Sequence, residues 1–325
     1  MLAYITRRFL YAILILVGVN LLTFVLFFKV NTPDDIARMQ LGTKRVTQEA
    51  INKWKAERGY DKPLIFNTKA QGMGMVKETI YFEKSFEMFS LNFGRADDGC
   101  DIAREIVHRA GPSLALAIPV FAVGLVVNIT FALIMAFFRA SYIDFVGVIV
   151  CVVLMSISGL FYIIGGQYVM SKVLNLAPIS GYQDGFAGWK FLLLPTIISV
   201  FSGIGSGTRW YRTIFLEEIV KDYVRTARAK GLSEFTVLFK HVLKNGLIPI
   251  LTGAVVVIPL LFMGSLISES FFGIPGLGSY TIEAIQSQDF GVVRSMVFIG
   301  SALYIFGLLL TDISYTWADP RVRLE

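Results

Sequence analysis

The chain has 325 residues, of which 55% are hydrophobic and 17% are charged, with a formal net charge of +6. This composition lies outside the usual range for soluble globular domains and within that of proteins that cross a membrane several times. The positive charge does not favour a nucleic-acid-binding protein, because the two Cys and two His lack zinc-finger spacing and no glycine-and-aromatic RNA-binding motif is present.

A membrane-spanning helix needs about 20 apolar residues to cross the hydrocarbon core of a bilayer. Six stretches contain no Asp, Glu, Lys, Arg or His, namely 9–28, 110–138, 145–171, 191–208, 245–268 and 295–311. The first is too long for the core of a cleaved signal peptide, so we expect it to be retained. The sequence therefore predicts an all-α polytopic membrane protein with six transmembrane helices.

The distribution of Lys and Arg predicts the orientation of these helices. With the N-terminus in the cytoplasm, the inner side receives Arg7, Arg8 and the basic segment 209–246, whereas the short outer connections hold Lys172, Lys190 and Arg294. Because cationic connections resist translocation, both termini are predicted to be cytoplasmic. The predicted organisation is a tip and first helix (1–28), an outer subdomain (29–109) and a core of five helices (110–325).

The outer segment 29–109 has 14 Lys and Arg against 12 Asp and Glu. That balance favours a folded aqueous module over a polyanion-binding tail. We expect a helix from Thr47 to Arg58, with turns at Asn31-Thr32-Pro33 and Gly72-Met73-Gly74. The segment is predicted to form a small periplasmic subdomain.

The predicted spans contain many small residues, and Gly203 and Gly207 stand four apart. This spacing places both glycines on one helix face, where another helix can approach closely. Two interpretations stay open: a mobile or pore-facing helix, or ordinary helix packing, which is the commoner use of such a pattern.

Motifs for enzyme chemistry are absent from the sequence. It contains no phosphate-binding loop of the Gly-x-x-x-x-Gly-Lys-[Ser/Thr] type, no His-Glu-x-x-His, no Gly-x-Ser-x-Gly and no Cys-x-x-Cys. We therefore expect no enzymatic activity and no cofactor in this chain. The charge-free spans also count against an ion-coupled secondary transporter, which usually holds an ionisable group at mid-membrane, but that class remains an alternative.

The basic inner segment 209–246 is longer than a connection between two spans requires. Its pattern predicts one helix through Glu217, Glu218 and Tyr223 to Lys230, and then a left-handed cap at Gly231. Ser233 is predicted to be the N-cap of a second helix with Glu234 in its first turn. That helix carries an apolar face at three- and four-residue spacing, formed by Phe235, Leu238, Phe239 and Val242.

This predicted cytoplasmic elbow has two interpretations. Its cations would hold the segment inside the cell and contact anionic lipid, each contributing about 1 kcal/mol near the membrane surface. Alternatively, a capped elbow with Leu232 and Phe235 at its tip would fill a groove on another protein. Lipid contact needs neither a glycine turn nor a helix cap, which favours the second interpretation.

The elbow resembles the cytoplasmic signature of bacterial ATP-binding-cassette (ABC) importer permeases. That signature consists of Glu-Ala-Ala, then three residues, a Gly, nine further residues and finally Ile-x-Leu-Pro. The stretches RTARAKG and KHVLKN keep this spacing, with Arg225 in the place of Glu, Thr226 in that of the first Ala and Lys244 in that of Pro. This substituted form is similar to the dipeptide, oligopeptide and nickel permease branch.

Further stretches in the same order resemble that branch, among them RGYDKP, LNFGRA, ESFFGIPGLGSY and DISYTWADPRVR. The long outer segment is similar to that of the first of the two permease subunits, and the elbow to the oligopeptide type that also admits peptide antibiotics such as microcin C. The resemblance implies import of peptides across the bacterial inner membrane. Import of nickel or another small solute is the alternative within the family.

The resemblance also implies partners and site residues. The partners are a second homologous permease, two ATPase domains that bind ATP and Mg, a periplasmic solute-binding protein and the lipid bilayer, with no nucleic acid. The ATPase-coupling residues would be Arg225, Thr226, Ala227, Gly231, Leu232, Ser233 and Phe235. The resemblance further implies a tight non-helical excursion at the periplasmic mouth, containing Phe272, Gly273, Pro275, Gly276 and Gly278. Beside it, Glu269 would either cap local backbone or gate the substrate.

Overall fold

The computed structural model describes residues 2–42 and 46–318. Within these ranges the regular secondary structure is helical, and the β-type pairing consists of an isolated bridge between Arg95 and Asp101. The chain divides into two compact units. Unit 1 comprises Met1–His108 and Glu283–Ile305, and unit 2 comprises Arg109–Ile282 and Phe306–Glu325.

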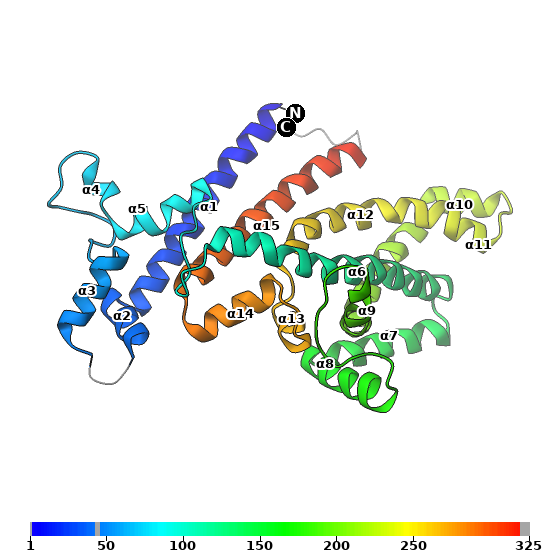
Figure 1. Ribbon diagram of the computed structural model, residues 1–325. Helices are drawn as coiled ribbons and strands as arrows, with labels where there is room; N and C mark the ends of the chain where they lie inside the picture. Colours follow the sequence, from blue (N-terminus) through cyan, green and yellow to red (C-terminus); the bar gives the residue numbers. More distant parts are fainter. Residues whose placement is uncertain (1, 43–45, 319–325) are drawn as a thin grey trace. The chain divides into compact units, whose positions relative to one another are not determined.

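The helices are labelled in Figure 1. Those before the boundary at His108 are α1 (Leu2–Val30), α2 (Pro33–Leu41), α3 (Gln48–Arg58), α4 (Gly74–Lys77), α5 (Ile80–Lys84) and the 3-10 helix η1 (Phe86–Ser90). The helices α6 (Ile102–Phe137), α14 (Leu277–Ser287) and α15 (Phe290–Ala318) contribute to both units. Unit 2 holds α7 (Tyr142–Ser156), α8 (Gly159–Gln167), the π-helix η2 (Tyr168–Val173), η3 (Phe186–Gly188), α9 (Trp189–Ile219), α10 (Asp222–Ala229), α11 (Glu234–Thr236), the π-helix η4 (Val237–Val242), α12 (Leu243–Leu260), η5 (Leu261–Met263) and α13 (Leu266–Phe272).

Among the described residues, five helices are long and apolar enough to cross a membrane, and a sixth span results if one bent pair is counted as a span. The five are Thr6–Val30, Ile102–Phe137, Trp189–Ile219, Glu234–Met263 and Phe290–Ser314. A mostly helical, multi-pass membrane protein is thereby confirmed. The helices also run beyond the charge-free stretches, because long charged side chains at a helix end can reach the interface.

The third predicted span, 145–171, is not one continuous helix. The chain bends by 89° between Tyr142–Ser156 and Gly159–Val173. Ile157 and Ser158 at the bend have extended backbone, with ψ of 129° and 142°. Tyr162 donates its hydroxyl proton to Leu154 O at 2.8 Å and thereby satisfies a carbonyl near the end of α7. The Ser-Ile-Ser-Gly sequence provides residues that favour helix ends over helix interiors.

The fifth predicted span, 245–268, was wrong at both ends. The helix begins at Glu234, so the expected second helix of the elbow is the first part of this span, and it ends at Met263. Gly264 follows with a φ of 66°, a conformation that would strain any L-residue with a side chain. Ser265 is then the N-cap of the separate helix α13. Residues 264–268 therefore lie outside the span.

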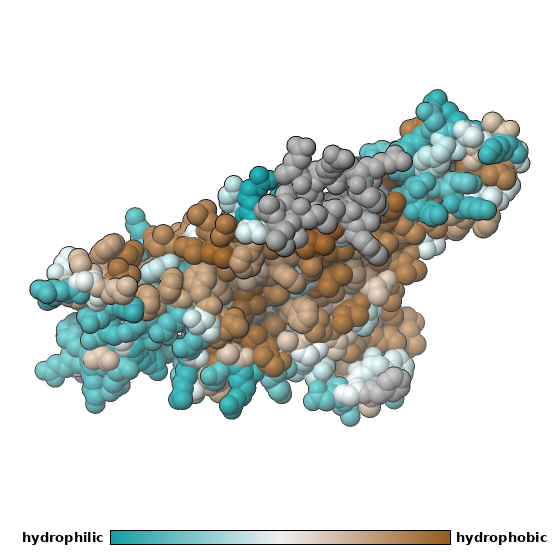
Figure 2. Space-filling view, turned by 90° about the horizontal axis from the view of Figure 1, so that it is seen from above, coloured by the Kyte–Doolittle hydropathy of each residue, from teal (hydrophilic) through white to brown (hydrophobic). Residues whose placement is uncertain are grey.

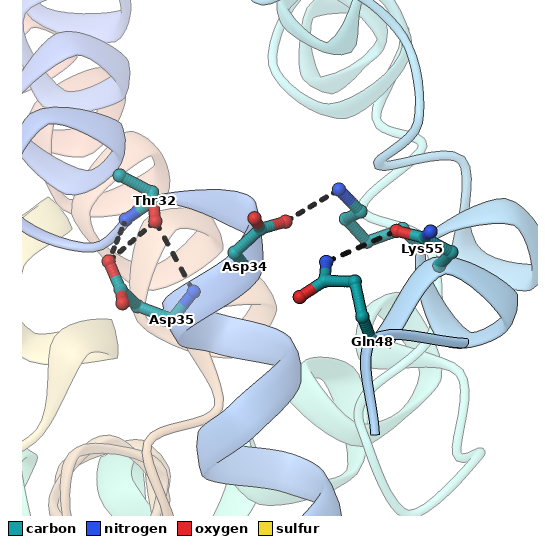
Figure 3. A network of polar contacts seen from close by, with 6 residues as sticks. Thr32, Asp34, Asp35, Gln48 and Lys55 are labelled. Carbon is teal, nitrogen blue, oxygen red and sulfur yellow. Dashed lines mark hydrogen bonds and ion pairs between the residues drawn. The ribbon is translucent and has the colours of Figure 1, made fainter. Parts of the chain in front are cut away.

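Unit 1 has a core in which α1 packs against the hydrophilic helices that follow it. Its buried members are Phe24, Phe28, Ile36, Ala37, Ile51, Trp54 and Ile80. Thr32 and Asp35 form a capping box at the start of α2, and Lys55 of α3 pairs with Asp34 of α2 at 2.5 Å (Figure 3). The predicted helix from Thr47 to Arg58 is confirmed as α3, with Thr47 as its N-cap.

One residue of unit 1 differs from its predicted placement. Arg294 was expected in an outer connection, but it lies within α15 and is 5% exposed. The charge-free stretch begins at residue 295, whereas the helix already begins at Phe290. A charge therefore lies inside a helix that is long enough to span the membrane.

Unit 2 is held together by close contacts of α9 with α6 and α7. A Cβ atom on Gly207 would lie 2.6 Å from the Asn128 amide, and one on Gly205 would lie 2.6 Å from Cys151 O, whereas Gly203 has open space around it. Asn128 also accepts a hydrogen bond from Thr208 at 3.1 Å. The glycines that another helix approaches are therefore Gly205 and Gly207, rather than the predicted pair Gly203 and Gly207.

A bidentate ion pair also joins α9 to α7. Arg212 donates from Nε and Nη2 to the two carboxylate oxygens of Asp144, both at 2.7 Å. Asp144 additionally accepts from Ala140 N at 3.2 Å. The pair satisfies a buried acid next to the membrane-spanning part of α9, where an unpaired charge would be costly.

Candidate functional site

Glu269 lies in the first turns of α13 and is fully buried. Its Oε1 accepts a hydrogen bond from Ser265 N at 3.1 Å, and its Oε2 accepts from Gly278 N at 2.7 Å and Ser279 N at 3.1 Å. The last two donors belong to the first turn of α14, where unpaired N–H groups and the helix dipole favour a negative charge. The carboxylate thus joins the starts of two helices, and we call this arrangement the Glu269 nest.

Glycines and a serine from a distant helix complete the Glu269 nest. A Cβ atom on Gly264 would lie 2.0 Å from Glu269 Oε1, and one on Gly276 would lie 2.3 Å from Oε2 and 2.4 Å from Ser113 Oγ. Ser113, in α6, accepts a hydrogen bond from Leu277 N at 2.7 Å. No side chain fits at the two glycine positions unless the carboxylate moves.

Burial raises the pKa of Glu269 above its ordinary value of 4.5, against the opposing effect of its hydrogen bonds to Ser113, Ser279, Ser265 and Gly278. Burial is the largest of these effects, since the low-dielectric surroundings disfavour the ionised form. The donors nevertheless give the charged form several partners. The site therefore holds a carboxyl group that is easier to protonate than one in water.

The Glu269 nest borders a cavity of about 470 Å³ inside unit 2. Helices α6, α8, α9, α12 and α13 contribute to its wall, which is mainly apolar with serine hydroxyls and Glu269 as its polar groups. The hydroxyls come from Ser113, Ser199, Ser202, Ser265 and Ser268. A wall of this kind suits a polar solute with an apolar part.

The predicted excursion near Glu269 is shorter than expected. Phe272 is the last residue of α13 and is buried, and Gly273 forms the left-handed C-cap with a φ of 64°. Pro275 is exposed and Gly276 is buried in the turn that follows. Gly278 lies within α14, so the non-helical part is 273–276. Of the predicted residues, Gly276 and Gly278 both lie directly against the Glu269 carboxylate.

The predicted first helix of the elbow is broken at 220–221 instead of running through to Lys230. Helix α9 ends at Ile219, and α10 begins at Asp222. Glu218 stabilises the break, because its carboxylate pairs with Lys221 Nζ at 2.5 Å and accepts from the Tyr223 hydroxyl at 2.6 Å. Burial, followed by the hydrogen bond to Glu218, raises the pKa of Tyr223 to about 12.

Gly231 ends α10 in the left-handed conformation, with a φ of 74°. Gly231 N donates to Arg228 O at 2.9 Å and Leu232 N donates to Ala227 O at 3.4 Å, which together form a Schellman motif. Ser233 then caps α11 by accepting from Thr236 N. Arg228 adds a bidentate ion pair with Glu234, at 2.7 and 3.1 Å, across the turn.

The predicted elbow residues divide into a buried set and an exposed set. Ala227 is buried with Val224 in a core that includes Phe215 of α9 and Val242 of η4. Arg225, Thr226, Gly231 and Ser233 are exposed, while Leu232 and Phe235 are 39% and 62% exposed. Arg225 pairs with Asp222 at 3.5 Å. The elbow therefore has a fixed base and an accessible tip.

Figure 1 shows α10 and α11 side by side beyond one end of α12, and in Figure 2 this end of unit 2 is largely hydrophilic. Of the apolar residues predicted to share one face of the helix after Ser233, Phe235, Leu238 and Phe239 line the same apolar pocket, but they differ in exposure. Leu238 and Val242 are buried in the core, whereas Phe235 and Phe239 are exposed, and their rings lie tilted against each other with centroids 4.4 Å apart. These two rings, with Phe137 and Phe138 of the α6 end, line an apolar pocket of about 260 Å³.

Several residues of these sites were not identified from the sequence. Ser113 and Gly264 belong to the Glu269 nest, and Glu218 holds the break between α9 and α10. Glu218 could have been suspected, since Lys221 stands three positions later and Tyr223 five. Ser113 gives no such signal, because its partner Leu277 lies 164 residues away.

The fold and sites together define a multi-pass helical membrane protein with a cavity among the helices of unit 2 and a capped, exposed elbow between α9 and α12. Residues 112–324 match the family described as binding-protein-dependent transport system inner membrane component, and residues 1–86 match the N-terminal part described for such membrane components. The chain belongs to this family of transport-system membrane components.

Similar proteins match along the whole chain. One, from Brucella abortus (strain 2308), carries the name "Putative peptide transport system permease protein" and is 32% identical, with 100% of both chains covered. A "Probable peptide ABC transporter permease protein" of Sinorhizobium fredii is 27% identical, covering 98% of this chain and 99% of its own. The dipeptide transport system permease protein DppB of Bacillus subtilis is 28% identical, covering 99% of this chain and 98% of its own.

Proposed function

We propose that the chain is a membrane-spanning permease subunit of an ATP-driven ABC importer that moves peptides into the cytoplasm across the bacterial inner membrane. The whole-length similarity to proteins named as peptide permeases supports this substrate class. In this proposal both termini are cytoplasmic, and a periplasmic binding protein delivers the peptide. A second homologous permease completes the channel, and two ATPase domains bind ATP and Mg.

The observation that carries the proposal is the elbow with its buried base and exposed tip. We assign ATPase coupling to Arg225, Thr226, Ala227, Gly231, Leu232, Ser233 and Phe235. Among them, Leu232 and Phe235 offer apolar surface to a groove on a partner, while the Schellman motif at Gly231 and the Arg228–Glu234 pair keep the turn rigid. Rigidity matters because a flexible tip would absorb a partner's movement rather than transmit it.

A single helix connects the elbow to the Glu269 nest. It runs for 30 residues from Glu234 to Met263, with left-handed Gly231 before it and Gly264, also at positive φ, after it. At about 1.5 Å per residue this corresponds to roughly 45 Å, which exceeds the thickness of the hydrocarbon core. In the proposal, displacement of the elbow by nucleotide binding is transmitted along this helix to the wall of the cavity. Glu269, Phe272, Gly273, Pro275, Gly276 and Gly278 then form the outer gate.

Gly231→Val tests the elbow, because a β-branched residue in the left-handed region costs about 1–2 kcal/mol and misdirects the tip. The chain would be reconstituted in vesicles with its partner permease and ATPases, and ATP-dependent uptake of a labelled peptide would be measured with the binding protein present. We expect uptake to fall strongly for Gly231→Val. Lys230→Gln, the control, removes the adjacent charge and keeps the glycine, and should retain uptake.

Uptake unchanged in Gly231→Val would contradict the role of the elbow. Transport that needs no ATP and collapses with a proton uncoupler would instead identify an ion-coupled carrier. Uptake of labelled nickel without uptake of peptide would support an ABC importer but identify nickel, rather than peptides, as its substrate.

A further inference from the structure

A cavity of about 610 Å³ lies within unit 1, and its lining includes none of the residues assigned to the elbow and the gate. It is bordered by the end of α3, by α5 and η1, by the segment around Asn92–Gly99 and by the start of α15. Charged side chains of both signs line it, the cations being Arg58, Lys84, Arg95 and Arg294 and the acids Glu57, Glu83, Glu87, Asp97 and Asp289. A volume of this size is typical of sites for small ligands.

Arg294 is the most deeply buried cation of this lining, with 5% of its surface exposed. Its hydrogen bonds go to neutral groups, from Nε to Phe290 O at 3.2 Å and from Nη1 to Ser85 Oγ at 3.5 Å, and the guanidinium lies 5.5 Å above the Phe28 ring. A guanidinium has five N–H donors, and neutral partners do not neutralise its charge. Among the described residues, Arg294 has hydrogen bonds and a ring contact but no ion pair.

Lys84 brings a second cation to the same cavity. Its Nζ lies 5.6 Å above the Tyr60 ring. Burial lowers the pKa of Lys84, and the nearby positive charge of Arg294 lowers it further, against the smaller opposing effects of Glu83 and Glu87. The two cations are therefore close enough to repel each other. An anion placed between them would relieve both the repulsion and the burial cost.

Most of the acids of the lining already have partners of their own. Glu83 pairs with Lys62, and Asp97 pairs with Arg58 at 2.8 Å. Asp289 accepts from Asp97 N at 2.7 Å and from Val292 N at 3.1 Å, and Glu87 accepts from Asn92 at 3.2 Å. Arg294 and Lys84 thus have no ion pair among the described residues, although Asp289 acts on the charge of Arg294, and Glu83 and Glu87 act on that of Lys84, from a distance.

We propose that this cavity binds the free carboxylate of a small zwitterion, with Arg294 and Lys84 as its partners. The acids of the lining that have no cation as ion-pair partner among the described residues, Glu57, Glu87 and Asp289, would repel a second negative charge and attract an ammonium group, so a zwitterion fits better than a polyanion such as phosphate. The identification of the zwitterion as a short peptide rests on the proposed function. The preference for a carboxylate rests on the cavity alone.

The test is a calorimetric titration of the full-length chain in lipid nanodiscs, without ATP, with trialanine, trialanine amide and inorganic phosphate as probes. Trialanine is expected to bind at millimolar concentration. Trialanine amide, which lacks the carboxylate, should bind at least about tenfold more weakly, as expected for loss of charge-assisted hydrogen bonds, and phosphate should bind more weakly than trialanine.

Three variants assign the site. Arg294→Gln and Lys84→Gln should each weaken trialanine binding and reduce the difference between trialanine and its amide. Lys55→Gln, which removes a cation paired with Asp34 outside the cavity, should leave both affinities unchanged. If Arg294→Gln does not fold, Lys84→Gln still decides the question.

Three results for the wild type would each overturn the inference: equal affinity for trialanine and its amide, stronger binding of phosphate than of trialanine, or no binding of trialanine. So would affinities that neither Arg294→Gln nor Lys84→Gln changes. The vesicle uptake assay is separate, because ATP-dependent peptide uptake combined with a negative titration refutes this site and keeps the importer. A positive titration without such uptake keeps the site and refutes the importer.

Discussion

Replacing Gly276 with alanine is expected to destabilise the chain by about 2–4 kcal/mol, because the added methyl group displaces the Glu269 carboxylate and leaves buried N–H donors unpaired. The Cβ atom would lie 2.3 Å from Glu269 Oε2, the oxygen that accepts from Gly278 N and Ser279 N. Each buried donor that loses its acceptor costs about 1–3 kcal/mol. Gly276 itself has no positive φ, so the cost comes from the close approach and not from backbone strain.

The assay is thermal unfolding of the purified chain in nanodiscs, with Gly253→Ala as the matched control. Gly253 lies in α12 and has no atom within 4 Å of a Cβ position. Alanine there should be neutral or should stabilise the helix by up to about 1 kcal/mol, since glycine is the weaker helix former. A loss of stability confined to Gly276→Ala attributes the effect to the nest rather than to glycine replacement in general.

A double-mutant cycle with Glu269→Ala gives the decisive result. Without the carboxylate, the close contact of the Gly276→Ala methyl group with Ser113 Oγ remains, so the loss of stability caused by Gly276→Ala should be smaller in the Glu269→Ala background than in the wild type, but not zero. If the two losses instead add, the methyl group does not act through Glu269 and the reasoning fails. The same conclusion follows if Gly276→Ala unfolds at the wild-type temperature.

Three further outcomes are expected in the same unfolding assay. The pKa of Glu269 in the folded state is raised above its ordinary 4.5, so the folded state binds the proton more tightly than the unfolded state does. The free energy of unfolding should therefore fall as pH rises from below 4.5 through the raised pKa. Glu269→Gln should flatten this pH dependence, and identical pH profiles of the wild type and the variant would refute it. Arg212→Ala should cost about 3 kcal/mol by leaving Asp144 buried and unpaired, whereas Arg209→Ala, at an exposed position, should change little. Tyr223→Phe should cost about 1.5–3 kcal/mol through its lost hydrogen bond to Glu218, while Tyr211→Phe, which removes no such bond, should be near neutral, and equal losses would contradict this.

The parts of the fold that depend on local sequence could be predicted. Apolar runs located the membrane-spanning helices, because the hydrocarbon core sets their length whatever they pack against. Thr47 and Ser233 were identified as N-caps, and Gly231 as a left-handed cap, since each acts within a few residues of its own position. Helix ends were less predictable, as at Ile102 and Ile219, because charged residues can continue a helix beyond the charge-free run.

The features that depend on distant residues could not be predicted. Glu269 was recognised as a residue of interest, but its buried arrangement needs Ser113 from α6 and the first turn of α14. The bend at Ile157 lies in an apolar run that hydropathy treats as uniform, and the Tyr162 hydroxyl that stabilises it is one of many tyrosine groups in the sequence. Composition records which residues are present, whereas these features depend on which surfaces meet.

The charges carried by the helices of this protein are stabilised in different ways. Asp144 is neutralised by Arg212 and Glu218 by Lys221. Glu269 has no cation in its nest but receives several N–H groups and a raised pKa, so it can be accommodated by hydrogen bonding or by protonation. Arg294 has no ion pair among the described residues: its hydrogen-bond partners are neutral, Asp289 acts on its charge only from a distance, and a guanidinium does not lose its proton in the physiological range. A buried cation without an ion pair, beside a second cation in an open cavity, is the place where an anion from outside the chain would gain most from binding.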